Sequence, residues 1–222
     1  MTFRARDLEL EMVEPGDVTF VRLFARTDAE WEPPPPMYRN ERCDPPPGKK
    51  DDYALLYTAD RIDATAMECR ILSVDRHGAW SYDDAKAKNY RVARYTFDQP
   101  AIFIPLDENR PHLDVDRQPF VPGYGAWQEA AHGLWTRFGM TVHGLSWWSM
   151  HRHQPGRVYA IWHHRKDAMG LARPMGPFDQ LHEDADWKAL LLANPGFSKL
   201  SPVGTAPSPS LPGAPPAGPA TP

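Results

Sequence analysis

Cysteine is scarce in this chain, and the scarcity excludes two classes of protein. Only two of the 222 residues are cysteines, Cys43 and Cys69. Two thiols cannot form the disulfide framework of a small secreted domain, and their spacing matches no zinc-binding pattern. The sequence therefore predicts a cytoplasmic protein with reduced thiols.

Excess positive charge and long apolar runs are lacking too. Lys and Arg total 25 against 29 Asp and Glu, which gives a net charge of −4 and no basic footprint of a nucleic-acid-binding protein. No apolar run approaches the roughly 18 residues that a membrane-spanning helix needs. The N-terminus lacks the apolar core of a signal peptide. We expect neither nucleic acid nor a membrane as a direct partner.

The C-terminal segment, residues 200–222, has no aromatic and no charged residue and is rich in proline, alanine, serine and glycine. Such a segment cannot bury enough apolar surface to offset the entropy that ordering would cost. We expect a disordered tail there. Residues 1–199 contain the apolar residues for a core and are expected to form one folded domain.

Apolar periodicity in the folded part predicts strands and helices in mixed order. Alternation with period two predicts strands over residues 17–25, 53–59, 90–107 (divided at Pro100), 142–148 and 157–163. Helical periodicity predicts helices over residues 61–72, with Asp60 as the N-cap, over 124–138, and around 187–194. This order predicts an α+β fold with a mixed or antiparallel sheet and flanking helices.

Two charged residues occupy places where the pattern favours apolar ones. Arg22 lies between Phe20 and Phe24 on one strand face. Either its head reaches water at a sheet edge, or it binds an anion, because the guanidinium fork matches phosphate. Glu68 flanks the packed side of the helix predicted over residues 61–72. It is either a solvated flank residue or a functional carboxylate whose partner lies elsewhere in the chain.

Two further polar residues are ambiguous on their own. Arg42 lies in a proline-studded loop, residues 31–50, and loops of that length are often functional, although an isolated arginine there also fits a surface role. Ser149 follows two tryptophans at a strand end. Its surroundings are not the G-x-S-x-G nucleophile elbow, so a serine hydrolase is disfavoured.

Clustered histidines raise the question of a metal site. The sequence has "HRH" at residues 151–153 and "HH" at 163–164. No H-E-x-x-H or comparable ligand motif accompanies them. Adjacent histidines on a strand point to opposite faces, so only one of His163 and His164 could face a given site. We predict no metal site.

Four motifs, taken in order, resemble the RES domain, which is named for its Arg, Glu and Ser. They are "VRLF" with Arg22, "RCD" at 42–44, "LYTA" and "AME" at 56–68, and "GLSWWS" at 144–149. Cys43 stands where that family usually has an aromatic residue. The similarity covers about residues 16–165, and the joint order of the motifs makes it specific.

The resemblance implies an ADP-ribosyltransferase-like fold and an enzyme that consumes NAD. RES proteins break the bond between nicotinamide and ribose, with water or phosphate as acceptor, and many are toxins paired with an Xre-type antitoxin. NAD is then a substrate, and no cofactor is expected. The implied catalytic residues are Glu68, Arg22 and Ser149, and Arg42 and Tyr57 are implied to bind substrate.

The residue types suit that chemistry. A carboxylate such as Glu68 can stabilise the oxocarbenium-like state of a breaking N-glycosidic bond. Guanidinium groups suit a pyrophosphate, and the ring of Tyr57 can stack on nicotinamide. Ser149 would bond the substrate or orient Glu68. The absence of G-x-G-x-x-G counts against a dehydrogenase.

Two other functions stay open. The same NAD site could transfer ADP-ribose to a protein or nucleic acid. The chain could also be a catalytically silent interaction module whose proline-rich loop and tail recruit partners. The oligomeric state, a homo-oligomer included, cannot be read from the sequence.

Overall fold

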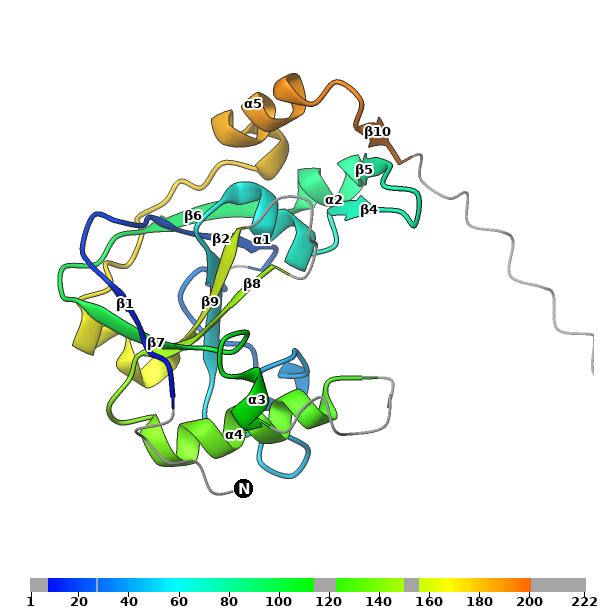
Figure 1. The fold of residues 1–222 in the computed structure, drawn as a ribbon. Coiled ribbons are helices and arrows are strands. Elements are labelled where there is room, and N and C mark those ends of the chain that lie inside the picture. Colours follow the sequence, from blue (N-terminus) through cyan, green and yellow to red (C-terminus); the bar gives the residue numbers. More distant parts are fainter. Residues whose placement is uncertain (1–7, 27, 114–122, 150–155, 201–222) are drawn as a thin grey trace, which may run out of the picture.

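The computed structural model describes residues 8–26, 28–113, 123–149 and 156–200. Within these ranges the chain forms one large sheet, one small sheet and flanking helices (Figure 1). The α+β class with a mixed sheet and flanking helices is therefore confirmed. Residues 201–222 lie outside the described residues, so the disordered tail stays a prediction.

The large sheet has the strand order β1-β7-β8-β9-β3-β2-β6, and its neighbours are antiparallel except for the parallel pair β7–β8. Its strands are β1 (Glu11–Val13), β2 (Phe20–Phe24), β3 (Leu55–Ala59), β6 (Arg91–Tyr95), β7 (Ala101–Pro105), β8 (Gly144–Trp148) and β9 (Arg157–Trp162). The small sheet has the order β10-β5-β4 and consists of β4 (Leu72–Val74), β5 (Trp80–Tyr82) and β10 (Ser198–Lys199).

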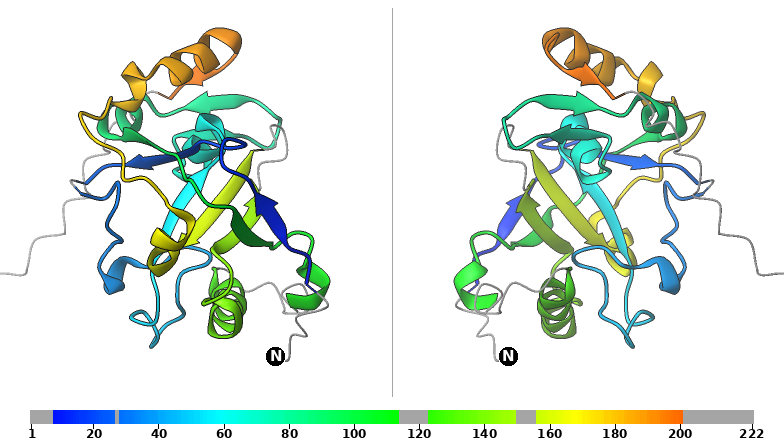
Figure 2. Two further views of the ribbon diagram at one scale, coloured as in Figure 1. Left: turned by 90° about the vertical axis from the view of Figure 1, so that its left-hand side faces the viewer. Right: turned by 90° about the vertical axis from the view of Figure 1, so that its right-hand side faces the viewer.

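The helices gather at opposite ends of the large sheet (Figure 2). At one end lies α4 (Gly125–Phe138), with α3 (Arg110–Leu113) beside it. At the other end lie α1 (Ile62–Glu68), α2 (Asp84–Asn89) and α5 (Ala185–Ala193) with the small sheet. The short 3-10 helices are η2 (Pro36–Tyr38), η3 (His163–Arg165), η4 (Asp167–Met169) and η5 (Leu181–Glu183).

The described residues form three apolar clusters, and two of them include the helices at the two ends of the sheet. The inward side of α4, with Leu134, packs against strand residues such as Leu145 and Trp162. The α1 end has its own cluster, in which Val21 of β2 packs with Met67 of α1.

The start of α1 differs from the sequence prediction. Arg61 is the N-cap, and no side chain caps the helix there. Asp60, predicted as the cap, instead accepts a hydrogen bond at Oδ1 from the backbone N–H of Arg157, at 2.8 Å. The Asp60 carboxylate therefore bonds β9 instead of capping the helix, which is the role that local propensity had predicted for it.

The end of α1 also differs, because the helix stops at Glu68 rather than near residue 72. Arg70 is left-handed, with φ of 54°. The Arg70 N–H donates to the Met67 carbonyl, and the Ile71 N–H donates to the Ala66 carbonyl, which is the Schellman pattern of a helix C-terminus. Residues 72–74 then form β4 instead of another helical turn.

Small side chains bring α1 close to the sheet. Ala64 is almost fully buried and faces Gly156, at the start of β9. A Cβ at Gly156 would lie 2.4 Å from the Cβ of Ala64, closer than van der Waals contact allows. The height of α1 above the sheet is thus set by an alanine against a glycine.

The histidine prediction was wrong in one respect. His163 and His164 lie in η3, just beyond β9, and not on a strand. Residues 151–153 fall outside the described residues. In the part of the chain that the structure describes, no group of three His, Cys, Asp or Glu side chains gathers as a metal site would require. That same part holds no helix long and apolar enough to cross a membrane.

Candidate functional site

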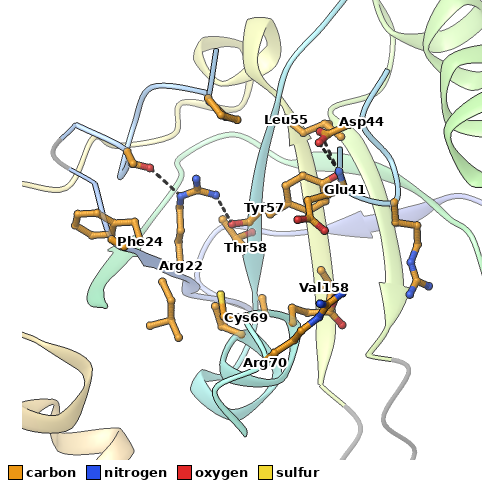
Figure 3. Close-up of a pocket in the computed structure, with 18 of the residues that line it drawn as sticks. Arg22, Phe24, Glu41, Asp44, Leu55, Tyr57, Thr58, Cys69, Arg70 and Val158 are labelled. Carbon is orange, nitrogen blue, oxygen red and sulfur yellow. Dashed lines mark hydrogen bonds between the residues drawn. The ribbon is translucent and has the colours of Figure 1, made fainter. Parts of the chain in front are cut away.

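A pocket of about 770 Å³ lies beside β2, β3 and α1, and members of all three apolar clusters line it (Figure 3). Four of the five predicted site residues line it: Arg22, Arg42, Tyr57 and Glu68. The fifth, Ser149, is not on the wall but contacts Glu68. Residues far apart in the sequence are thus brought to one place.

Arg22 fills the gap where β2 and β3 separate. These two fully described strands share a single register pair, Val21 with Ala59. Beyond that pair, the Nη1 of Arg22 donates to the Tyr57 carbonyl at 2.9 Å and its Nε donates to the Ala29 carbonyl at 3.0 Å (Figure 3). Side-chain donors here replace ladder hydrogen bonds between the strands.

The charge of Arg22 has no carboxylate partner within ion-pair distance among the described residues. The sheet-edge alternative is wrong, because β2 lies between β3 and β6. Burial lowers the pKa of Arg22, although nearby Tyr95 and Cys69 oppose the shift. Of the five N–H groups of a guanidinium, two are bonded to carbonyls, so the rest can serve a ligand.

Glu68 and Ser149 form a hydrogen-bonded pair. Glu68 is the last residue of α1 and is exposed, whereas Ser149 is only 5% exposed just after β8. The Ser149 hydroxyl donates to Oε1 of Glu68 at 3.2 Å. The structure thus places Ser149 where it can orient Glu68, one of the two roles expected of it.

Tyr57 is fixed at its hydroxyl. That group donates to Oδ1 of Asp44 at 3.3 Å and accepts from the Cys43 N–H at 3.2 Å. Its ring meets the Trp147 ring edge-on, at 6.3 Å between centroids. Burial raises the pKa of Tyr57 well above its ordinary value, so the hydroxyl stays neutral and the ring presents an apolar surface to the pocket.

Arg42 lies among aromatic rings. Its Cζ is 5.7 Å from the ring centroids of Tyr124 and Trp127 and 5.9 Å from that of Trp147. Cation–π attraction holds a guanidinium in such a place without neutralising it. Arg42 and Glu68 also border a second, smaller pocket of about 340 Å³.

Sequence reasoning missed several wall residues. Glu41, Asp44 and Arg70 line the pocket as well, and Figure 3 shows Glu41 and Asp44 across from Arg22. Asp44 had a signal, because it ends the "RCD" motif, but Glu41 and Arg70 had none beyond lying next to motif residues. Burial raises the pKa of the Asp44 carboxyl.

The pocket wall also contains a thiol. Burial raises the pKa of Cys69, next to Glu68, to about 12, against the opposing charge of Arg22. The thiol is therefore protonated at neutral pH and a poor nucleophile. The groups suited to chemistry in this pocket are its guanidinium and carboxylate side chains.

The pocket wall carries charges of both signs. Arg22 lines it from β2, and three further arginines, Arg26, Arg42 and Arg70, line it as well. Carboxylates line it from the loop that follows η2 and from the end of α1. This arrangement suits a ligand that carries an anionic group at one place and develops positive charge at another.

No family model and no curated protein matches the chain. Among solved structures, it is similar to a chain in the crystal structure of the M. tuberculosis MbcT–MbcA toxin–antitoxin complex. The match has a TM-score of 0.46 and 14% identity, and it covers 78% of this chain and 88% of the other. A likeness at that level says nothing about activity. Membership of the RES family and the ADP-ribosyltransferase-like fold stay predictions.

Proposed function

We propose that the protein cleaves the N-glycosidic bond between nicotinamide and ribose in NAD, with water or phosphate as acceptor. One observation carries the proposal: Arg22, which has no carboxylate partner among the described residues, lines the same pocket as Glu68, which Ser149 holds by a hydrogen bond. The convergence of motif residues from distant parts of the chain supports it as well.

The Arg22 guanidinium indicates an anionic ligand. A partly buried guanidinium is costly unless a counter-charge and hydrogen bonds compensate it. Arg22 has two carbonyl acceptors and, among the described residues, no carboxylate at ion-pair distance. A ligand phosphate would supply the missing charge and accept the remaining N–H groups. The pyrophosphate of NAD fits this requirement.

The carboxylate suits the bond that breaks. When the C–N bond of NAD cleaves, its electron pair leaves with nicotinamide, which is thereby neutralised and needs no proton. Positive charge then builds up on the ribose. Glu68 can stabilise that charge and hold a ribose hydroxyl, while Ser149 fixes one of its oxygens. Water or phosphate would complete the reaction by attack on the same ribose carbon.

Tyr57 and Arg42 would serve binding. The Tyr57 ring is fixed through its hydroxyl and can stack on nicotinamide. Arg42, held by ring faces, keeps its N–H groups for a second phosphate oxygen or for the acceptor.

In the cell, such an activity would deplete NAD. We propose that the protein is the toxin of a toxin–antitoxin pair with an Xre-type antitoxin, on the strength of the RES-like motifs. Induced expression should then lower cellular NAD and stop growth, and co-expression of the neighbouring antitoxin should restore both.

The deciding experiment is an assay of nicotinamide release from NAD, in buffers with and without phosphate, for wild type and Glu68→Gln. We expect Glu68→Gln to lose activity by about 10²–10³-fold, the usual effect of losing one preorganised electrostatic group, with an unchanged circular dichroism spectrum. Glu129→Gln, which alters an exposed carboxylate on α4 outside the pocket, should keep full activity.

No nicotinamide release by wild type in either buffer would refute the proposal. Full activity of Glu68→Gln would remove Glu68 from the mechanism. ADP-ribose found on a macromolecule by mass spectrometry, in place of free products, would favour the transferase alternative.

A further inference from the structure

Three consecutive backbone carbonyls, those of residues 29–31, each accept a hydrogen bond from a distant side chain. The donors are the Nε of Arg22 for the first, the hydroxyl of Tyr95 for the second and the Nζ of Lys166 for the third. Arg22 lines the pocket, whereas Lys166 does not. The segment therefore links a pocket residue to a lysine outside the pocket.

Lys166 is set in the protein interior between η3 and η4. Its residue is 3% exposed. The Nζ donates to the Trp31 carbonyl at 3.1 Å, lies 2.8 Å from Nε2 of His163, and lies 3.7 Å from the centroid of the Trp31 ring. Burial lowers the pKa of His163. The same Nε2 lies 3.2 Å from the Trp31 carbonyl, so the Lys166 ammonium and the His163 ring both contact that carbonyl.

The hydrogen bonds and the ring contact of the Lys166 ammonium all lie in one place, beside Trp31 and His163. No carboxylate lies within ion-pair distance of Lys166 among the residues described. All its strong contacts are to Trp31 and to His163. Its interactions therefore serve to hold the Trp31 end of the segment.

Residues 29–31 need such side-chain support. They lie in a turn and pair with no strand, and Asp28 before them is left-handed, with φ of 63°. The other acceptor of Arg22, the Tyr57 carbonyl, belongs to β3 and is fixed by the sheet. The angle of the Arg22 guanidinium is thus set by one rigid carbonyl and one carbonyl that depends on distant side chains.

We propose that Lys166 is a positioning residue for Arg22. Its ammonium holds the carbonyl and the ring of Trp31 and so restrains residues 29–31. This restraint places the Ala29 carbonyl, which orients the Arg22 guanidinium in the pocket. The consequence for activity rests on the NAD-cleaving function proposed above, whereas the positioning itself does not.

This arrangement responds to pH. Burial lowers the pKa of Lys166 to about 8, more than the charges of Glu32 and Asp167 raise it, while Arg173 and Arg22 add to the lowering. Below that pH the ammonium donates to the Trp31 carbonyl and attracts the Trp31 ring. As pH rises through 8, the amine loses its charge, the cation–π attraction is lost, and residues 29–31 are held less firmly.

The test compares Lys166→Met with Arg173→Met. Arg173 contributes a cation to the same segment through an ion pair with the Glu30 carboxylate, at 3.0 Å, but bonds no backbone carbonyl there. For Lys166→Met we expect KM for NAD at pH 7 to rise about tenfold, the effect of one charge-assisted hydrogen bond, with kcat nearly unchanged. Arg173→Met should leave KM within about twofold, because Arg173 is half-exposed and its loss removes no donor from a backbone carbonyl of the segment.

Two further measurements separate positioning from a general structural effect. Wild-type KM should increase above pH 8, and Lys166→Met should lack that increase. Tyr95→Phe, which removes only the hydroxyl that bonds the Glu30 carbonyl, should raise KM in the same way while the ring still fills the core.

Hydrogen exchange of the Arg22 Nε–H, followed by NMR at pH 6.5, distinguishes failure of the inference from failure of the proposed function. We expect faster exchange in Lys166→Met than in wild type and in Arg173→Met. Unchanged exchange would overturn the positioning role, whatever the enzyme does. Faster exchange in a protein that cleaves no NAD would support the positioning role and refute the function. An equal rise of KM in both variants would also overturn the inference, because it would show a general charge effect.

Discussion

The large sheet contains two inward-facing arginines, Arg157 and Arg22, which differ in whether carboxylates compensate their charge. Arg157 of β9 bonds Oε2 of Glu11 at 2.9 Å, the Ser146 hydroxyl at 3.2 Å and Oε1 of Glu108 at 3.3 Å. Arg22 of β2 bonds two backbone carbonyls and no carboxylate in the described chain. Burial acts to lower the pKa of both, but at Arg157 the carboxylates outweigh it and the pKa is raised.

The difference indicates which charge is available to a ligand. The charge of Arg157 is neutralised within the protein, so it contributes to the structure and has little left to offer. The charge of Arg22 is oriented by carbonyls but has no carboxylate at ion-pair distance among the described residues, so a ligand anion could compensate it. Two residues of one type, in one sheet, can thus be assigned to structure and to binding by their partners alone.

Arg157→Met should have the largest effect, and on stability. Removing the guanidinium leaves Glu11, which is 22% exposed at its side chain, without its cationic partner, although the hydroxyls of Ser146 and Tyr159 still donate to it. We expect the free energy of unfolding to fall by about 3 kcal/mol, as for other broken interior ion pairs, in urea denaturation. The double variant Arg157→Met/Glu11→Gln should recover part of the loss. A single variant as stable as wild type would contradict the structural assignment.

Arg22→Met should show the reverse pattern. We expect kcat/KM for NAD cleavage to fall by about 10²-fold, since an oriented cation in a site contributes about that much, while the free energy of unfolding changes by less than about 1 kcal/mol. Inorganic pyrophosphate should raise the melting temperature of wild type but not of this variant. Equal protection of both proteins would show that Arg22 is not the anion site.

A matched pair of serines sharpens the comparison at smaller scale. Ser146 donates to Glu11 in the structural cluster, and Ser149, three residues later, donates to Glu68 in the pocket. Ser149→Ala should lower kcat about tenfold, the effect of losing one hydrogen bond to a charged group, with little change in stability. Ser146→Ala should lower stability and leave kcat unchanged.

A double-variant cycle checks the partner of Ser149. In a Glu68→Gln background, Ser149→Ala should have little further effect on kcat, because the two act as a unit. Additive losses would mean that Ser149 acts on the substrate rather than through Glu68.

Elements with long periodic patterns could be predicted from the sequence. The strands β2, β3, β8 and β9 and the helix α4 all fall within their predicted ranges. The small sheet could not be predicted, because its strands are two or three residues long and β10 pairs with β5 from more than a hundred positions away. A strand that short is defined by its partner and not by its own pattern.

The residues of the candidate site likewise depend on partners that are distant in the sequence. The local pattern did not distinguish a functional Glu68 from a solvated flank residue, because Ser149, its hydrogen-bond partner, lies 81 positions later. Four of the five residues that the family resemblance implied line one pocket, and their functional roles stay a prediction. The resemblance gave no sign of the contacts that hold Arg22, since backbone carbonyls carry no residue signal and Lys166 belongs to none of the quoted motifs.

The contact between Ala64 and Gly156 keeps α1 at a short, fixed distance from the sheet. Two residues with almost no side chain set the distance between helix and sheet, and Glu68 extends from the far end of that same helix. An added methyl group at either position would push α1 away from the sheet and tilt the Glu68 carboxylate relative to the pocket. The position of Glu68 in the pocket therefore depends on a close contact between two residues that do not line the pocket.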